Sequence, residues 1–417
     1  MPPFRLAPRT AAAVAAAVAL AACGDGPTTP TATAPAAQFR RLLVADSGNF
    51  ARLYDLETAA RADSMGGLPG RITYLYTAMG RIAAAHFQTQ NRVAFIDGGV
   101  YEQAGRGVAA QARIIGTHDD QTPIHGNTNG TLLSAHFDGS GNVKFWDETM
   151  LAQGNVTPML TVNTGPAHHG AGVALTGDLV TASIRSATGT SPDGIVAFNR
   201  QGQRVDSTRA CPGLHGLAAG KDGVLYGCLE GTMYVTASGG RATFSAIKNP
   251  DAPTMRVGTV WSSPNAANFL VRMTVPGAAV SPTTRVLGVA DVAARVLRPA
   301  ALPGGDLDWT ATLDYSGTRA LVLGYSGTLY VIDLATRQVT GQVANLVPAR
   351  PASGAVLDPS FATAAGVAYV ASPTQGRVYE VTVAAQTALA RTLTVGGTPL
   401  RLAVMGVRED KRLQPAN

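Results

Sequence analysis

A short pattern recurs along this chain and restricts what it can fold into more than any other feature does. It consists of an apolar residue, a spacer and an aromatic residue, often followed by an acid, and it returns at intervals of 36 to 53 residues. An apolar run and a glycine-rich turn precede each copy, as in Leu321–Gly327, which predicts two strands joined by a tight turn. Seven copies are clear, and an eighth place lacks the aromatic residue: Arg52–Asp55, Val93–Asp97, Val143–Asp147, Val196–Asn199, Thr232–Tyr234, Thr328–Asp333, Val378–Glu380 and, without the aromatic, Arg285–Leu287.

These repeats predict an all-β fold, a β-propeller over residues 39–408, because repeats of this length built from short strands are typical of propeller blades. The 417-residue chain has 47 glycines and only 14% charged residues, and no segment shows sustained helical periodicity. Eight blades are favoured, and seven is the alternative if the weak unit at 256–300 merges with a neighbour.

Closure of the ring is also predicted. The last apolar run, Leu400–Met405, has no partner strand of its own, whereas the first unit, which starts at Arg41, is one strand short. Pairing the N- and C-terminal strands in one blade closes the ring and removes its exposed edges.

The first 22 residues are expected to be a lipoprotein signal peptide. Arg5 and Arg9 form a basic start, Ala11–Leu20 is a short apolar stretch, and Leu20–Cys23 resembles a bacterial lipobox. The alternative is an ordinary secretion signal with an incidental cysteine. The lipobox implies lipidation of Cys23 and stable anchoring to the membrane through this lipid.

The segments that flank the propeller are expected to be flexible. Residues 23–38 are rich in Pro, Thr and Ala and are interpreted as a lipid-anchored tether, and residues 409–417 as a C-terminal tail. With Gly24 after the cysteine, the expected location is the cell envelope, at the outer membrane facing the periplasm.

Three histidines stand before glycines at matching places in three successive repeats. They lie in Pro123–Gly126, Ala167–Gly170 and Gly213–Gly216, 44 and 46 residues apart. The innermost strand of each propeller blade lines the axial channel, so these imidazoles are expected to converge at its mouth and to hold a metal ion. The candidate ligands are His125, His168 or His169, and His215. Each histidine alone is more simply explained as structural; the repeat-matched set favours a metal.

Further groups near these histidines are weaker candidates for the metal site. Asp97, Asp119 or Asp120 offers a carboxylate. His86 and His136 form a second matched pair on expected second strands, which packing against Phe87 and Phe137 explains equally well. His118 lies in a polar connection, where it either delivers metal or is simply solvated.

Apart from Cys23, the chain has two cysteines, Cys211 and Cys228. In an exported protein such a pair forms a disulfide by default, and this one would staple the backbone that presents His215. The alternative is that Cys228 is a free thiolate and a zinc ligand beside His215.

The segments Gly165–Gly170, Cys211–Gly216 and Gly227–Cys228 resemble the AztD family of periplasmic zinc metallochaperones, with the best similarity over residues 70–235. The resemblance implies a β-propeller that binds Zn(II) and passes it to the solute-binding protein of a zinc ABC importer. It places metal ligation on His125, His168 or His169, and His215, and the disulfide on Cys211 and Cys228. This chain differs from that pattern in its lipobox and in having few histidines around His118.

Two other classes of function compete with zinc transfer. A lipid-anchored propeller scaffold for protein–protein interaction needs no metal. A metal-dependent hydrolase of the lactonase kind needs a carboxylate-rich axial site and a general base, which the histidines do not supply. We therefore expect no enzyme activity and a monomer. The net charge of +6, or +4 without Arg5 and Arg9, and the absence of a basic run argue against nucleic acid.

Overall fold

The computed structural model describes residues 35–417 except 177, 189–190, 385 and 417. The predicted signal peptide, the predicted lipidation site Cys23 and most of the predicted tether lie outside the described residues. Two compact units are separated at Pro35, and the second spans Ala36–Asn417. Within the described part of the chain, no helix has the length and apolar character needed to cross a bilayer.

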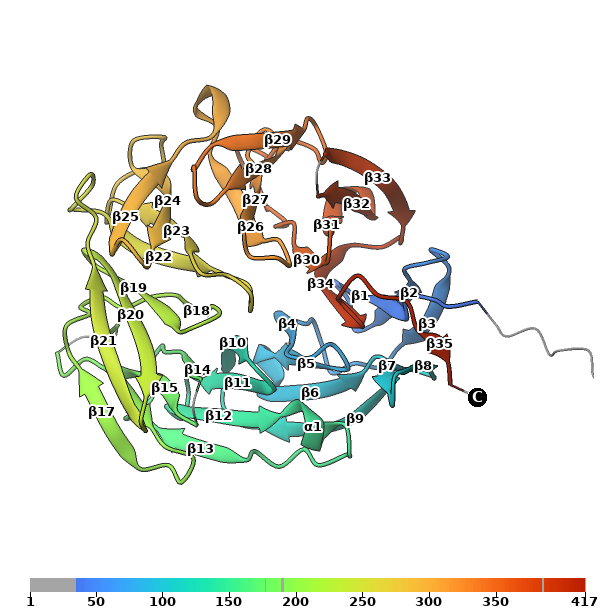
Figure 1. Ribbon diagram of the computed structural model, residues 1–417, viewed down its shortest axis with the longest axis horizontal. Helices are drawn as coiled ribbons and strands as arrows, with labels where there is room; N and C mark the ends of the chain where they lie inside the picture. Colours follow the sequence, from blue (N-terminus) through green and yellow to red (C-terminus); the bar gives the residue numbers. More distant parts are fainter. Residues whose placement is uncertain (1–34, 177, 189–190, 385, 417) are drawn as a thin grey trace, which may run out of the picture. The chain divides into compact units, whose positions relative to one another are not determined.

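Eight four-stranded antiparallel sheets make up the second unit, and Figure 1 shows them placed one after another around a central axis. The described residues therefore confirm the all-β propeller. Strands are given from the axis outwards. The first two sheets contain β34 (Pro399–Gly406), β1 (Arg40–Asp46), β2 (Ala51–Asp55) and β3 (Arg61–Met65); and β4 (Tyr74–Thr77), β5 (Ile82–Phe87), β6 (Arg92–Asp97) and β9 (Arg113–Asp119).

The next three sheets carry the histidine motifs on or beside their innermost strands. They contain β10 (Pro123–Asn129), β11 (Leu132–Phe137), β12 (Asn142–Asp147) and β13 (Leu160–Asn163); β14 (Gly172–Ala174), β15 (Val180–Arg185), β16 (Pro192–Phe198) and β17 (Arg204–Thr208); and β18 (Leu217–Ala219), β19 (Val224–Cys228), β20 (Gly231–Ser238) and β21 (Arg241–Ile247).

The last three sheets complete the ring. They contain β22 (Arg256–Trp261), β23 (Phe269–Thr274), β24 (Arg285–Asp291) and β25 (Val296–Ala300); β26 (Asp308–Leu313), β27 (Arg319–Gly324), β28 (Leu329–Asp333) and β29 (Val339–Val343); and β30 (Phe361–Ala364), β31 (Val367–Ser372), β32 (Arg377–Val383) and β33 (Thr387–Thr394). The sheet β22–β25 holds the weak repeat at 256–300 as a separate unit.

The remaining elements are short. A three-stranded sheet contains β7 (Val100–Gln103), β8 (Arg106–Ala109) and β35 (Gln414–Pro415), and the helices are α1 (Glu148–Leu151) and the single 3₁₀ turns η1 (Gln88–Gln90), η2 (Pro303–Gly305) and η3 (Pro373–Gln375). The expected C-terminal tail contributes β35, which pairs in parallel with β8, and Leu413 bridges to Ala37. Part of this segment is therefore hydrogen-bonded to the propeller.

The core lies between neighbouring sheets. Second strands are buried on both faces, as in β11, whose six residues are all buried, whereas a fourth strand such as β3 is largely exposed. The recurring aromatic residue of each repeat fills the space between blades: Phe95 on β6 packs against Trp146 on β12 with ring centroids 5.2 Å apart. Burial of one such side chain is worth about 1.5–3 kcal/mol, which explains why the pattern recurs in sequence.

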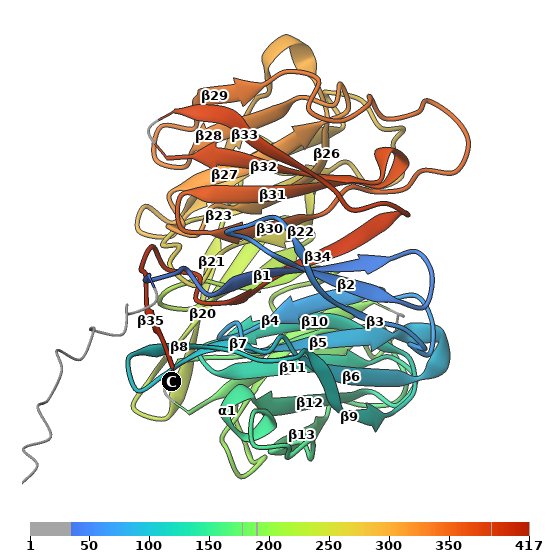
Figure 2. The same cartoon turned by 90° about the vertical axis from the view of Figure 1, so that its right-hand side faces the viewer.

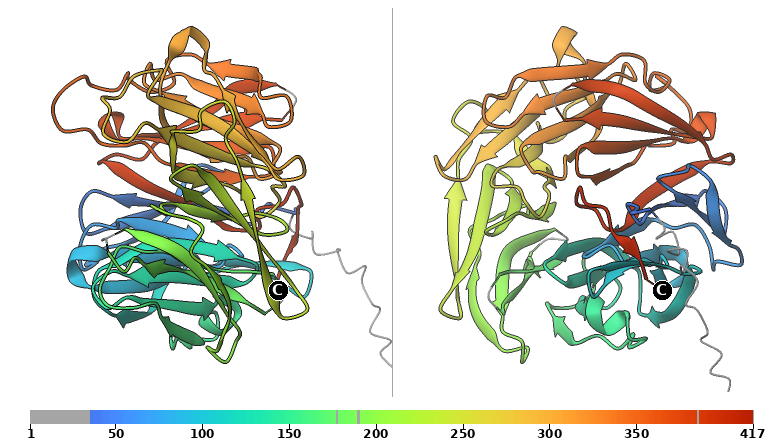
Figure 3. Two further views of the ribbon diagram at one scale, coloured as in Figure 1. Left: turned by 90° about the vertical axis from the view of Figure 1, so that its left-hand side faces the viewer. Right: turned by 45° about the vertical axis from the view of Figure 1, so that its right-hand side comes forward.

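The predicted closure is confirmed. Strand β34 pairs antiparallel with β1, with Val404 opposite Leu42 and Ala403 opposite Leu43. Figures 2 and 3 show this strand, red in the colour scale, lying beside the blue N-terminal strands. Leu42 and Val404 share a buried cluster with Tyr369 of the last sheet, so apolar packing continues across the junction between the two ends of the chain.

Met405 on β34 is fully buried and packs against the first and second sheets. We expect Met405→Ala to lower the free energy of unfolding by about 2–5 kcal/mol, because a cavity is left where the ring closes. Urea unfolding followed by circular dichroism measures the change. Leu389→Ala, at a side chain that is 46% exposed on β33, is the control and should change stability by about 0.5 kcal/mol or less. Equal losses in the two variants would contradict a role for β34 in holding the ring closed.

Candidate metal centre

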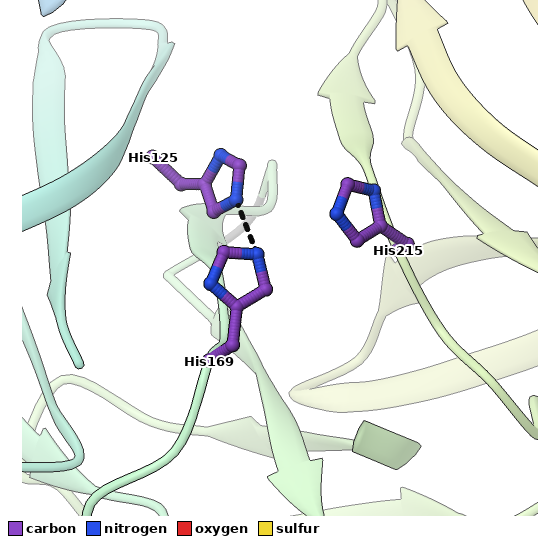
Figure 4. Close-up of side chains that lie close together, drawn as sticks. All are labelled: His125, His169 and His215. Carbon is purple, nitrogen blue, oxygen red and sulfur yellow. Dashed lines mark hydrogen bonds between the residues drawn. The ribbon is translucent and has the colours of Figure 1, made fainter. Parts of the chain in front are cut away.

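Three histidine side chains converge from three successive sheets at the channel mouth. His125 lies in β10, His169 lies just before β14 and His215 just before β18. One ring nitrogen from each falls within 4.8 Å of the other two, and the Nε2 atoms of His125 and His169 are 2.9 Å apart. Figure 4 shows the three rings facing one another. All three are only partly buried, so the cluster is open to solvent.

The backbone at His125 is strained in a way that aims its side chain at the cluster. His125 has φ of 45°, a left-handed conformation that costs a non-glycine residue free energy and that persists only where the surroundings enforce it. The pairing of β10 with β11 shifts register between Ile124 and Gly126, so His125 is the extra residue of a β-bulge. The bulge turns the imidazole out of the regular alternation of the strand.

The glycine after each histidine is required by close neighbours. A Cβ on Gly126 would lie 1.8 Å from the Tyr76 ring, and one on Gly170 would lie 2.5 Å from His136 Nε2. Gly216 has φ of 74° and faces the Gly258 carbonyl at 2.9 Å. The absence of a side chain at these glycines therefore lets neighbouring groups come close to the backbone that presents the histidines.

Two of the three rings are held by hydrogen bonds at the nitrogen that faces away from the cluster. His169 Nδ1 is 2.8 Å from Asp138 Oδ2, and His215 Nδ1 is 2.7 Å from the Gly258 carbonyl oxygen. Because a carboxylate and a carbonyl only accept, each Nδ1 carries the proton. In the neutral ring the Nε2 lone pair is then free to bind a metal, an arrangement that raises the basicity of the ligand.

Electrostatics keep this cluster ready for a cation at neutral pH. Desolvation, with repulsion from His169 and His215, lowers the pKa of His125 to about 3, and burial lowers the pKa of His215. Burial alone would raise the pKa of Asp138, but hydrogen bonds from His136 and His169 outweigh it and hold that pKa well below its usual value. Neutral imidazoles with an anionic carboxylate behind them suit a divalent metal.

The donor set fits zinc. Zn–N bonds of about 2.0–2.1 Å in a tetrahedron place ligand nitrogens roughly 3.3 Å apart, so the 2.9 Å pair must open slightly and the wider separations, up to 4.8 Å, must contract. Without a metal, His169 Nε2 accepts a hydrogen bond from His125 Nε2–H. The proton must leave His125 Nε2 before that nitrogen can bind a metal. Among the described residues the group contains no fourth His, Cys, Asp or Glu, which leaves one coordination position open.

The structure decides between His168 and His169, which both lie in the segment before β14. His168 points the other way: its Nδ1 is 2.7 Å from the Pro166 carbonyl oxygen and its Nε2 is 3.4 Å from Thr164 Oγ1. It also packs edge-on against His136, with ring centroids 5.1 Å apart. His168 is thus outside the three-histidine group.

The second matched pair of histidines lies behind the cluster. His136 Nδ1 is 2.9 Å from Asp138 Oδ1, and His86 Nε2 is 2.6 Å from the Tyr76 hydroxyl. Both side chains are fully buried. Both lie behind the three-histidine group and are not members of it.

The other weaker candidates are engaged elsewhere. Asp97 pairs with Arg81 at 3.2 Å, Asp119 with Arg92 at 2.6 Å and Asp120 with Lys144 at 2.7 Å. His118 Nε2 is 2.8 Å from Lys144 Nζ. The structure brings none of these four side chains into the three-histidine group.

The disulfide between Cys211 and Cys228 is confirmed, with Cα atoms 5.0 Å apart, so neither sulfur is left as a thiolate ligand. His215 pairs with Gly227 rather than with Cys228: the His215 amide donates to the Gly227 carbonyl oxygen at 3.0 Å. The bridge lies one residue further along and clamps the hairpin that presents His215.

Two partners of the site were missed by the sequence analysis. Asp138 follows His136 by two residues, which places both side chains on one face of an extended segment, and this spacing was a usable signal. The Gly258 carbonyl oxygen left no signal, because a backbone acceptor from the next sheet is independent of residue type.

Fold and site together define a class of protein, a β-propeller whose channel mouth holds three histidines. No protein-family model and no curated protein matches the sequence. Among solved structures, apo AztD from Citrobacter koseri is 19% identical, with a TM-score of 0.76 over 88% of this chain and 97% of that chain. A second structure of Citrobacter koseri AztD is 18% identical with the same TM-score and coverage. The chain has an AztD-like fold. The Saccharomyces cerevisiae protein Sqt1 is more distant, 13% identical with a TM-score of 0.52 over 82% of this chain and 90% of that chain.

Asp138 should control metal affinity without touching the metal. We expect Asp138→Asn to weaken zinc binding by about 10- to 100-fold, since loss of an outer carboxylate leaves the His169 ring poorly oriented. Competition titration with a chromophoric chelator measures the affinity. Asp119→Asn, at an exposed carboxylate paired with Arg92, is the matched control. A loss of affinity in the control, or none in Asp138→Asn, would show that Asp138 does not act through His169.

Stability should fall in mild acid because of His86. Burial lowers the pKa of His86 to about 3, so below about pH 6.5 the unfolded chain takes up a proton that the folded chain refuses. This contribution to stability is complete above the unfolded pKa and is lost as the pH falls toward 3. Between about pH 7.5 and pH 5 it amounts to about 2 kcal/mol of unfolding free energy.

The variant His86→Gln cannot take up this proton and isolates the effect. Urea unfolding at the two pH values should show a smaller acid loss in His86→Gln than in the parent, whatever the absolute stability of the variant. Equal losses would mean that His86 is not held neutral by burial.

Proposed function

We propose that this protein is a zinc-binding metallochaperone of the cell envelope. In this proposal it binds Zn(II) through His125, His169 and His215 and passes the ion to the solute-binding protein of a zinc ABC importer. The observation that carries the proposal is the convergence of three imidazole nitrogens, within 4.8 Å, from three consecutive sheets. The AztD-like fold supports it, because the family that this sequence resembles transfers zinc in the periplasm.

The chemistry of the site suits a cargo that must be released. Neutral imidazole ligands bind zinc without the tight grip of a four-thiolate site. The open fourth position lets an incoming ligand bind before a histidine leaves, so that the ion need not pass through water. Zinc is the cargo in this scheme and no substrate is transformed, so we propose no enzyme activity.

Attachment to the membrane belongs to the same proposal. A lipid on Cys23 would hold the protein at the outer membrane facing the periplasm, and the segment 23–38 would let a monomeric propeller reach an acceptor. Labelling with a radioactive fatty acid, compared between the parent and Cys23→Ala, tests this part independently of the metal site.

The deciding experiment is zinc content and affinity of the parent beside the triple variant His125→Ala, His169→Ala and His215→Ala. We expect about one zinc per chain in the parent and almost none in the variant, because too few ligands remain to hold the ion. His118→Ala is the control, since this histidine contacts Lys144 away from the cluster, and it should bind as the parent does.

Zinc transfer is then measured by mixing the loaded protein with a metal-free zinc-importer binding protein and following the metal after separation. Absence of zinc from a folded parent, or equal zinc in the triple variant, would overturn the proposed site. That result would favour the lipid-anchored scaffold that the sequence left open.

A further inference from the structure

The mouth that holds the three histidines is surrounded by arginines that have no carboxylate partner. Arg71, Arg185 and Arg256 form no ion pair within 4.0 Å to any described residue, unlike arginines such as Arg92 and Arg209, which pair with Asp119 and Asp193. We call these three residues the arginine rim. They come from the second, fourth and sixth sheets, whereas the histidines come from the third, fourth and fifth.

Topology places the rim at the same end of the sheets as the metal centre. The innermost strands start at the mouth, and Arg256 is the first residue of β22, while Arg71 precedes the first residue of β4 by three positions. Second strands run the opposite way and end at the mouth, and Arg185 is the last residue of β15. The rim residues therefore lie on one face although they are far apart in sequence.

Contacts tie the rim to the histidine layer. Arg256 Nε donates to the Gly213 carbonyl oxygen at 3.0 Å, two residues from His215, and Arg256 lies two residues from the Gly258 carbonyl that holds the His215 ring.

A fourth arginine, Arg401, lies beside the arginine rim, near the start of the innermost strand β34 of the first sheet. Arg401 Nε donates to the Thr73 carbonyl oxygen at 2.8 Å, next to Tyr74, whose ring lies 5.8 Å from the His125 ring. Burial, and then repulsion from Arg71, lower the pKa of Arg401, and Tyr74 and Asp358 partly counter this effect. Asp138, the carboxylate nearest the histidines, is already bonded to two imidazoles.

This arrangement is the reverse of what a site evolved only to hold a cation needs, because positive charges near the ligands oppose the binding of Zn²⁺. The rim is explained if a negative group from outside completes the site. Arg185 and Arg256 are partly buried and Arg71 is exposed, and their positive charges attract carboxylates and steer charged partners toward the open coordination position.

We infer that the arginine rim docks an acidic segment of the protein that accepts the metal, with a carboxylate of that segment entering beside the three histidines. This inference rests on the proposed function for the identity of the partner. The recognition itself needs no metal, since it depends on the charges of the rim.

The test uses metal-free full chain in a neutral detergent and a fluorescent peptide of six consecutive glutamates, with a six-glutamine peptide as the uncharged comparison. Fluorescence anisotropy reports binding. We expect the glutamate peptide to bind and the glutamine peptide not to bind. Raising the salt from about 20 mM to about 200 mM should weaken the complex, since screening acts on exposed charges.

The decisive variant is Arg71→Gln, Arg185→Gln and Arg256→Gln together. We expect it to bind the glutamate peptide about tenfold more weakly, as expected for three lost charge contacts of modest individual strength. The matched control is Arg61→Gln, Arg113→Gln and Arg295→Gln, which removes the same net charge. These control arginines are exposed and lie at the start of fourth strands, which is the opposite end of the sheets, and the control should bind as the parent does.

Equal weakening in the two triple variants would overturn the inference, because net charge alone would then explain binding. The rim triple variant is also tested with anionic phosphatidylglycerol vesicles. If it loses the vesicle binding of the parent but binds the glutamate peptide as the parent does, the inference is overturned in favour of a membrane surface. If the rim triple variant does not fold, Arg71→Gln alone, at an exposed side chain, should still weaken binding about twofold. The peptide experiment contains no zinc, so its failure would not affect the test of zinc binding. In the same way, a protein that does not bind zinc can still be tested for peptide binding.

Discussion

Pairing of β34 with β1 is the contact on which the rest of the structure depends. Each sheet buries its faces against its two neighbours, so an open array would leave two apolar sheet faces and two strand edges exposed. Closing the ring removes all of these and also defines a common axis. His125 and His215 belong to sheets that are not adjacent, and only the curvature of a closed ring brings their nitrogens within 4.8 Å. The metal centre is in this sense a consequence of closure.

The site itself is made from departures from regular strand geometry. A positive φ at His125 and a bulge at the same residue redirect one ligand, and glycines at 126, 170 and 216 admit Tyr76, His136 and the Gly258 carbonyl against the backbone. Such strain costs free energy and is kept where surrounding contacts enforce it. The disulfide performs a related task for His215, since it clamps the hairpin that carries that ligand.

Charge divides the channel mouth into two layers with opposite preferences. Behind the histidines, Asp138 is held anionic by two imidazoles and favours a cation. In front of them, the arginine rim opposes a cation and favours an anion. In the proposed function, the histidines and Asp138 hold the metal, and the arginine rim places an incoming carboxylate beside it. The proposal thus assigns binding and release to different residues of one mouth.

The sequence by itself determined the propeller class, the strand–turn–strand composition of its repeats, the terminal pairing and the three histidine positions, because all of these follow from short-range periodicity and from the spacing of repeats, but it left the number of blades open between seven and eight. The disulfide followed from the count of two cysteines. Only the tertiary structure decided that His169 enters the cluster and His168 does not, because both lie outside the strands and their rings are held by contacts with Asp138 and with Pro166, respectively. It also decided that Asp97, Asp119 and Asp120 are occupied by basic partners, and that Asp138 and a backbone carbonyl hold the ligands. These contacts join different sheets, and no local pattern specifies them.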